Sequence, residues 1–196
     1  MISISMRYEA QHKERTHRRI VRSAARQFRT EGMNGPGVAK LMKASGLTHG
    51  GFYKHFSSKD ALFAEAIDES VREVAAMLTN WPKQGRRDER WKEIVKKYLS
   101  IEHCEHPEIG CPIAALAPDI ARTRAPIKRE IRDSMEVYRK QLKEFMPGPN
   151  PAAKQKNFAL IFTSMIGALA VARTMSDKEE KEQLLGLVRN HLLTSF

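Results

Sequence analysis

The fold is decided by residues 37–56, GVAKLMKASGLTHGGFYKHF. Four apolar side chains in this stretch are spaced so that two short helices can share one small core: Leu41, Leu47, Phe52 and Phe56. Gly46 stands between the two helices, where a tight turn needs backbone freedom. Proline suits a first helical turn, so we expect the first helix to open at Pro36 and the second to run over 47–56. This spacing indicates a helix-turn-helix.

The second of these helices carries small and polar residues that face away from the shared core: Thr48, His49, Gly50, Tyr53, Lys54 and His55. Such a helix fits the major groove of DNA, where hydroxyl, imidazole and ammonium groups reach base edges and phosphates. The pair Gly50-Gly51 is costly, since each glycine destabilises a helix interior by about 1 kcal/mol relative to alanine. Close approach of the backbone to DNA is one explanation, a poorly formed helix in the free protein is another, and the two are compatible.

The charge of the chain is concentrated near its start. The 196 residues carry a net charge of +11, and residues 1–60 hold 12 Lys and Arg against 4 Asp and Glu. A basic head on a near-neutral body is typical of nucleic-acid-binding proteins, whereas a solubilising surface would spread its charge. Ile20, Ala24 and Phe28 predict the packed face of a helix over 11–30. Its opposite face would offer an arginine stripe to solvent or phosphate: Arg15, Arg18, Arg22, Arg26 and Arg29.

The rest of the chain also shows helical periodicity, without the sustained alternation that marks strands. Ser57 and Asp60 have the spacing of a capping box at the start of a long helix that ends near residue 80. A breaker-rich linker follows over 81–87. Further helices are expected over 91–101, 112–122, 127–145, 152–175 and 177–194. The sequence therefore predicts an all-α protein of about nine helices.

Several segments resemble the DNA-binding head of the TetR (tetracycline-repressor) family. The residues that carry the resemblance are Phe28, Glu31-Gly32, Val38, Leu41, Ala44-Ser45-Gly46-Leu47 and above all residues 51–62, GFYKHFSSKDAL. The match covers about residues 15–67, and GCPIAALA at 110–117 looks like a stretch that recurs in many members. The resemblance implies a three-helix helix-turn-helix DNA-binding domain over 1–57. It also implies a helical ligand-binding and dimerisation domain over 58–196, entered through a connecting helix at about 58–80.

The resemblance also implies roles for individual residues in DNA binding. By position, Thr48, His49, Gly50 and Gly51 would face bases or the DNA backbone, while Tyr53, His55 and Lys59 would hold phosphates. Lys59 would stand in the first turn of the connecting helix, where the helix dipole favours an anion.

Two positions depart from the family pattern. Pro36-Gly37 replaces a pair whose hydroxyl commonly caps the second helix and touches a phosphate, so that contact is weakened. Met42 replaces a small residue, usually alanine, that lies against the recognition helix, which bears on the angle between the two helices.

The last two helices, over about 152–175 and 177–194, would form the interface of a homodimer if the family's architecture holds. Residues 158–172 are apolar almost all round, so this helix is expected to be buried on several sides. Operator recognition by a helix-turn-helix independently calls for two-fold symmetry. An internal core in a monomer is the alternative.

The segment over 103–111 contains both cysteines of the chain. The spacing of Cys104, Cys111 and the nearby histidines matches no standard zinc site, and we expect neither a metal nor a cofactor. Cys111 precedes Pro112 at a helix N-terminus, a setting that can lower the pKa of a thiol. Cys104 and Cys111 are therefore candidates for an inducer pocket or for sensing electrophiles or oxidants, with buried structural thiols as the alternative. The inducer would be a small organic molecule held by aromatic, Met and aliphatic side chains.

These observations predict a cytoplasmic, ligand-responsive transcriptional regulator: a repressor dimer that binds a palindromic operator and is released by a small-molecule inducer. No catalytic residues are expected, since there is no Gly-rich phosphate loop or nucleophile motif. An enzyme with a basic substrate channel and a nonspecific architectural DNA binder are the alternatives. Two cysteines exclude a disulfide framework, and no signal-peptide core opens the sequence. The apolar run at 158–172 is shorter than the roughly 20 residues that span a membrane.

Overall fold

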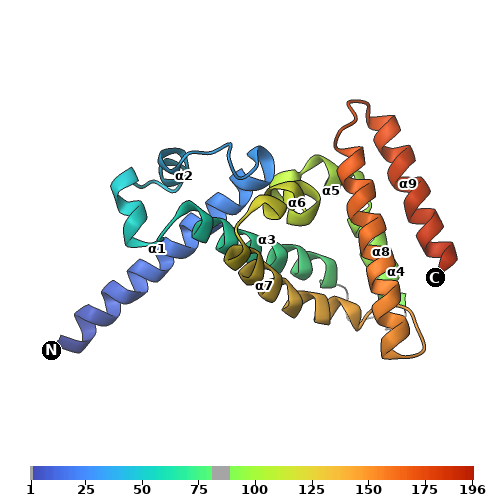
Figure 1. The fold of residues 1–196 in the computed structure, drawn as a ribbon, viewed down its shortest axis with the longest axis horizontal. Coiled ribbons are helices and arrows are strands. Elements are labelled where there is room, and N and C mark those ends of the chain that lie inside the picture. Colours follow the sequence, from blue (N-terminus) through green and yellow to red (C-terminus); the bar gives the residue numbers. More distant parts are fainter. Residues whose placement is uncertain (1, 81–88) are drawn as a thin grey trace.

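The computed structural model describes residues 2–80 and 89–196, with side chains from Tyr8 onward, so the linker expected at 81–87 lies outside the described residues. Every regular element within these ranges is helical, which confirms the all-α prediction (Figure 1). The α-helices are α1 (Ile2–Glu31), α2 (Val38–Ala44), α3 (Lys59–Thr79), α4 (Arg90–Tyr98), α5 (Ile101–Glu105), α6 (Pro112–Arg122), α7 (Ala125–Lys143), α8 (Pro151–Ala172) and α9 (Lys178–Ser195). Two short 3₁₀ helices are also described, η1 (His49–Lys54) and η3 (Pro107–Ile109).

Helix α1 packs against the other elements of the head through one apolar face. Ile20, Ala24 and Phe28 are fully buried, as their spacing predicts, and the Phe28 ring meets the ring of Phe63 on α3 edge to face at 5.2 Å. The helix begins at Ile2, well before the expected start at residue 11, because residues 2–10 contain neither proline nor glycine. Its first turns project beyond the rest of the molecule (Figure 1).

The buried apolar side chains form two clusters. The head cluster joins α1, α2, η1 and the first half of α3, and it also takes in Leu116 of α6 with Ile127 and Ile131 of α7. The second cluster fills the body between α4, α8, α9 and the far ends of α3 and α7. The head core therefore reaches past residue 57 and includes the start of two body helices.

The helix expected over 91–101 is interrupted. It ends at Tyr98, and Ser100 caps a new helix, α5, by accepting a hydrogen bond from the His103 amide at 3.2 Å. A serine hydroxyl competes well for a free amide at a helix start, which favours a break at this position over a continuous helix.

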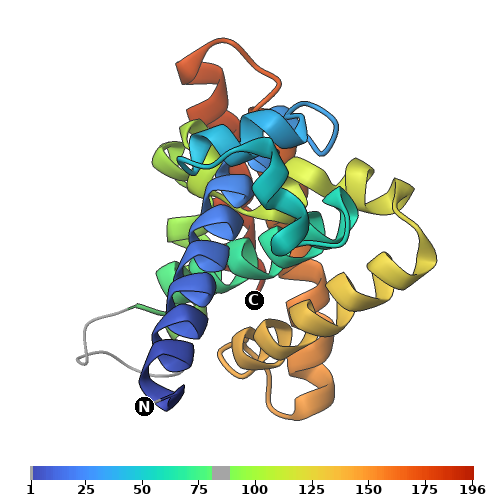
Figure 2. The same cartoon turned by 90° about the vertical axis from the view of Figure 1, so that its left-hand side faces the viewer.

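Helices α8 and α9 run side by side at the end of the molecule opposite α2 (Figure 1), and they lie behind the head in the view of Figure 2. Among the described residues, α8 is long and apolar enough to cross a membrane by length and composition. One side of it is nevertheless packed into the body core through Ile161, Met165, Leu169 and Ala172. This packing is that of a core helix in a helical body.

Candidate nucleic-acid interface and effector pocket

The helix-turn-helix is present, but its second helix is a 3₁₀ helix. Leu41, Phe52 and Phe56 are buried together, and Gly46 takes φ +68° in the turn between α2 and η1. The expected α-helix over 47–56 is replaced by the six residues of η1, His49–Lys54. Two adjacent glycines weaken an α-helix, and short segments of this kind are where 3₁₀ geometry occurs.

The structure brings most of the predicted DNA-binding residues onto one surface. Thr48, His49, Gly50, Tyr53 and Lys54 are exposed, with Tyr53 at 69%. Their exposure along one short element is what contact with base edges and phosphates requires.

Three further predicted DNA-binding residues are partly covered. Gly51 lies over Met42, and the ring centroid of His55 stands 5.9 Å from that of His17 on α1. Burial, and secondarily the neighbouring charges, lower the pKa of His55, so its ring is neutral at pH 7. Lys59 is the first residue of α3, and burial lowers the pKa of its ammonium group.

The two family departures have structural counterparts. The helix expected to open at Pro36 begins instead at Val38, with Gly37 as an N-cap that provides no side-chain hydrogen bond. Met42 is fully buried, and its Cε would lie 3.5 Å from a Cβ added to Gly51. The large residue on α2 thus faces the smallest possible residue on η1, which keeps the two elements close.

The cap of α3 differs from the predicted capping box. Ser58, not Ser57, is the N-cap, and its Oγ accepts a hydrogen bond from the Ala61 amide at 3.1 Å. The residue three positions after this cap is an alanine, which cannot bond back to the cap, and Asp60 pairs instead with Arg124 at 3.2 Å.

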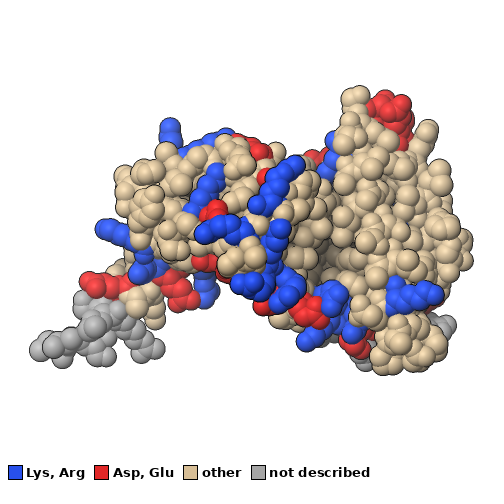
Figure 3. Space-filling model, viewed as in Figure 1, with Lys and Arg blue, Asp and Glu red and all other residues tan. Residues whose placement is uncertain are grey.

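The arginine stripe of α1 faces solvent at four of its five positions, as predicted, and Arg29 is the exception. Three of its members form ion pairs: Arg18 with Glu14, Arg22 with Glu69, and Arg29 with Glu73. Arg15, Arg18, Arg22 and Arg26 are all exposed, but the Arg29 side chain is fully buried. On the face drawn in Figure 3, Lys and Arg gather over the head and α7, while the end formed by α8 and α9 carries few of them.

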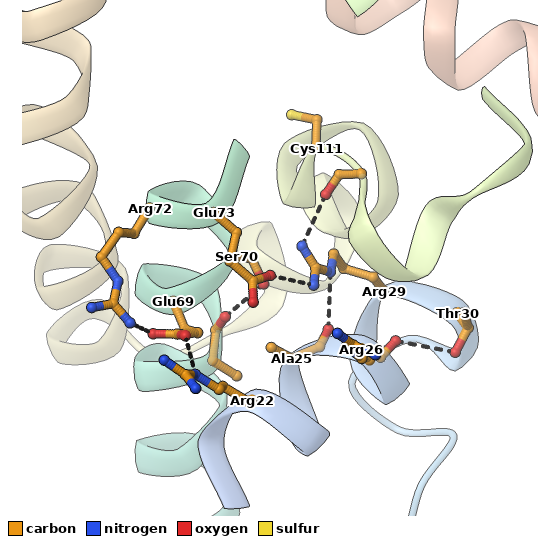
Figure 4. Close-up of polar contacts among 12 residues, drawn as sticks. Arg22, Ala25, Arg26, Arg29, Thr30, Glu69, Ser70, Arg72, Glu73 and Cys111 are labelled. Carbon is orange, nitrogen blue, oxygen red and sulfur yellow. Dashed lines mark hydrogen bonds and ion pairs between the residues drawn. The ribbon is translucent and has the colours of Figure 1, made fainter. Parts of the chain in front are cut away.

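Arg29 connects three elements, and sequence reasoning missed this role. Its guanidinium donates to the Ala25 carbonyl at 3.1 Å, to the Gly110 carbonyl at 3.1 Å and to the Glu73 carboxylate of α3 at 2.9 Å (Figure 4). Gly110 immediately precedes Cys111 in the chain. The sequence contains one signal of ion pairs between α1 and α3. Arg22 and Arg29 lie two turns apart on one face of α1, and Glu69 and Glu73 lie one turn apart on α3.

The segment 103–111 is held from both sides by buried polar groups. Burial is the chief reason that the pKa of His103 falls from 6.5 to about 4, so its ring is neutral. Its Nδ1–H donates to the Tyr98 carbonyl at 2.7 Å, and its Nε2 accepts the Cys111 amide at 3.0 Å. From α8, Arg173 donates to the carbonyls of His103 and Cys104 at 2.9 and 3.1 Å. The segment is therefore bonded to α1 through Arg29 and to α8 through Arg173.

A pocket of about 280 Å³ lies in the body beside this segment. Its wall is built from α3, α4, α7 and α8 and from the start of α6, and it is largely apolar: Val74, Leu78, Leu142, Phe158, Phe162 and Ile166 are typical members. Cys111 belongs to the wall, whereas Cys104 faces a different hollow and has its thiol pKa raised, chiefly by burial. A larger hollow of about 710 Å³ is lined by α1 alone, so no second element encloses it. The body pocket is the better candidate for binding a small molecule.

Metal ligation finds no support in the part of the chain that the structure describes. No group of three or more His, Cys, Asp or Glu side chains within residues 2–80 and 89–196 is placed to hold a metal ion.

Residues 48–54, most of which are exposed, form the segment of the helix-turn-helix that would contact DNA, called the reading segment below. A helix-turn-helix with such a segment, joined to a helical body with an apolar pocket, defines a DNA-binding regulator. Comparison with known proteins agrees. Residues 20–66 match the model of the bacterial regulatory proteins of the tetR family. A curated relative, an uncharacterized HTH-type transcriptional regulator YdgC of Bacillus subtilis, is 35% identical over 54 residues, which span 28% of each chain. The HTH-type transcriptional regulator LmrA of the same organism is 24% identical over 132 residues, or 64% of this chain and 70% of that protein.

The similarity to solved structures extends over the body. A TetR transcriptional regulator from Chloroflexus aurantiacus is 26% identical, with a TM-score of 0.71 and coverage of 94% of this chain and 95% of that one. A TetR-family regulator from Cytophaga hutchinsonii has a TM-score of 0.73 at 19% identity, covering 93% and 96%. Residues 20–66 therefore form a DNA-binding head of the TetR type, and the chain as a whole has the fold of TetR-family transcriptional regulators.

Proposed function

We propose that this regulator is a ligand-responsive repressor that binds a palindromic operator as a dimer and leaves it when a small molecule fills the body pocket. It would act in the cytoplasm, on chromosomal DNA. The observation that carries the proposal is the continuous bonding from the pocket wall to the head: Gly110 precedes the wall residue Cys111, and Arg29 ties the Gly110 carbonyl to α1 and α3.

The DNA side of the proposal rests on exposure and charge. Thr48 and His49 begin the exposed segment that would enter the major groove, and Gly50 lets the backbone approach the duplex. Tyr53, Lys54 and Lys59 would bind phosphates, with Lys59 placed at a helix N-terminus that also attracts anions. Gly51 and His55 would support the segment from its covered side, because they lie against Met42 and His17.

The dimer would form through α8 and α9. Along the outer side of α8, Leu160, Ser164, Gly167 and Val171 are exposed and uncharged at helical spacing. Leu187, in the middle of α9, is 71% exposed. Two copies of this helix pair, related by a two-fold axis, would cover these side chains in a four-helix interface and set the distance between the two reading segments.

Ligand response would follow from a shift between two dimer states. A ligand that fits the pocket better in one arrangement of α6 and α7 favours that arrangement. Because Leu116, Ile127 and Ile131 of these helices are part of the head core, a displacement there moves the head relative to α8 and α9. Operator affinity falls when the spacing of the two heads no longer fits the half-sites.

The proposal is tested by footprinting on the DNA around the gene, followed by fluorescence anisotropy on the protected sequence. We expect a palindromic footprint and a loss of sequence preference in His49→Ala, with Lys92→Ala on α4 as a control outside the head. Leu187→Glu should give monomers in analytical ultracentrifugation and weak operator binding. Its matched control is Val137→Glu, which places the same charge at an exposed apolar position of α7. Equal binding to all sequences would contradict a specific repressor.

A further inference from the structure

The wall of the body pocket contains a fully buried polar group that the rest of the protein scarcely satisfies. Tyr98 belongs to the pocket wall and is fully buried, and its hydroxyl oxygen has no hydrogen-bond partner among the described residues beyond the weak one that the neighbouring Cys111 thiol offers. Buried hydroxyls are nearly always paired, because an unpaired one loses its bonds to water and gains nothing in return. A scarcely satisfied hydroxyl in the wall of an apolar pocket is the feature that a ligand atom would satisfy.

Two of the groups around Tyr98 are already engaged. His103, which packs edge to face on the Tyr98 ring at 4.7 Å, uses both ring nitrogens on backbone groups. The Arg173 guanidinium is bonded to carbonyls of the segment 103–111. Burial is the chief reason that the pKa of Tyr98 lies well above its usual value of 10, and the neighbouring Cys111 thiol, a weak hydrogen-bonding group, raises it further. The hydroxyl therefore keeps its proton and is a hydrogen-bond donor at any ordinary pH.

The rest of the wall determines what kind of molecule can carry the acceptor. Phe158 and Phe162 are stacked at a centroid distance of 4.4 Å, and Phe162 stands 6.3 Å from Tyr98, so aromatic faces and edges surround the space next to the hydroxyl. The one basic side chain in the wall, Arg139, is half exposed and is bonded to Glu136 at 2.7 Å. A buried anionic ligand would thus meet no uncommitted cation in the wall, which favours an uncharged ligand.

We propose that the effector is a small, uncharged aromatic molecule with a carbonyl-type acceptor, and that the Tyr98 hydroxyl donates the hydrogen bond that selects it. A volume of about 280 Å³ is at the lower end of the range of ligand pockets, which limits the ligand to one or two rings. This assignment rests on the proposed function, since it names the ligand class of the same pocket.

The assignment is tested with pairs of probes that differ only in the acceptor. Acetophenone is compared with α-methylstyrene, and benzophenone with 1,1-diphenylethylene, so that each ketone oxygen is replaced by a methylene group of similar shape. Binding to the full-length protein without DNA is measured by isothermal titration calorimetry. We expect at least one ketone to bind about tenfold more tightly than its hydrocarbon partner, the size of a hydrogen bond to a group that is otherwise unsatisfied.

Tyr98→Phe should remove that preference, lowering the ketone affinity about tenfold and leaving the hydrocarbon affinity unchanged. The matched control is Tyr138→Phe, which deletes a hydroxyl from the same wall and should leave the preference intact. Because the deleted Tyr98 hydroxyl has no partner stronger than the Cys111 thiol, the melting temperature of Tyr98→Phe should equal or exceed that of the parent. A marked fall would show that the hydroxyl is already bonded within the protein and would overturn the proposal.

Three further outcomes also overturn the assignment: neither ketone binds, the preference survives in Tyr98→Phe, or Tyr138→Phe removes it. The proposed function is measured separately, by operator binding and its loss. A ketone that binds through Tyr98 but leaves the operator complex intact supports the ligand class and contradicts the ligand-responsive repressor. Release by other molecules, with no ketone binding, does the reverse.

Discussion

Replacing Arg29 with methionine keeps a long helix-forming side chain but removes one ion pair and two carbonyl hydrogen bonds from the junction of α1, α3 and the segment 103–111. Breaking a buried ion pair typically costs 3–5 kcal/mol, because the remaining charge loses its partner. Glu73 is one-third exposed and can recover water, which moves the expected value to the lower end. The Gly110 carbonyl loses its donor as well. We therefore expect Arg29→Met to lower the free energy of unfolding by about 3 kcal/mol.

The assay is urea denaturation at one fixed protein concentration, since the stability of a dimer depends on concentration. Arg26→Met is the matched control: it makes the same charge change one turn away, at an exposed side chain, and should stay within about 0.5 kcal/mol of the parent. In the double variant with Glu73→Gln, the combined loss should be smaller than the sum, because the carboxylate no longer needs a cation. Equal stability of Arg29→Met and Arg26→Met would refute the reasoning.

Three other predictions follow from single residues. The folded protein holds His103 at a pKa of about 4 against 6.5 when unfolded, so it binds fewer protons between these values, and stability is lost as the pH falls from 6.5 to 4. The free energy of unfolding, measured by urea denaturation, should fall by about 3 kcal/mol over this pH range because of His103. This contribution should be missing in His103→Gln. If the stability of the variant falls with acid as steeply as that of the parent, other groups cause the loss. Gly50→Ala puts a methyl group into open space, so it should stabilise the protein by up to about 1 kcal/mol and weaken operator binding, and an unchanged operator affinity removes Gly50 from the DNA contact. Lys59→Ala should reduce the slope of log affinity against log salt by about 1 in anisotropy titrations, and a constant slope excludes Lys59 from the phosphate contacts.

Periodicity was enough to place the helices, because burial follows from which residues recur on one face. The buried set Ile20, Ala24 and Phe28 was readable in this way, and α6 has the predicted bounds because proline marks its first turn. The same reasoning placed Thr48, His49, Gly50, Tyr53 and Lys54 on the outer side of the helix-turn-helix, and it placed His55 there as well, which is partly covered. It could not tell an α-helix from a 3₁₀ helix over so few residues, since the difference depends on how Met42 and Gly51 pack.

The polar junction could not be predicted because its partners are distant in the chain. Arg29 was assigned to an exposed face by its position on the helix, yet Glu73 and the Gly110 carbonyl, 44 and 81 residues further on, draw it into the interior. A long arginine side chain at the edge of a helix face can point either to solvent or into the protein, and the position of the nearest carboxylate determines the direction. The burial of Tyr98 follows from its place on the packed face of α4, whereas the state of its hydroxyl depends on the whole set of neighbours.

The division of the chain at residue 57 follows the connecting helix, but the hydrophobic core continues across it. Leu116, Ile127 and Ile131 pack with head residues, while α6 and α7 also line the pocket. Packed interiors transmit displacement because they have little free volume to absorb it. A ligand that moves the start of α6 must therefore either carry the head with it or break the Arg29 bond to Gly110, which sits at that point. If the bond breaks, Arg29→Met should mimic the ligand and bind operator weakly; if the head is carried, the variant should bind operator normally and lose only stability. Comparing its operator affinity with that of Arg26→Met at equal folded fraction decides between these two routes.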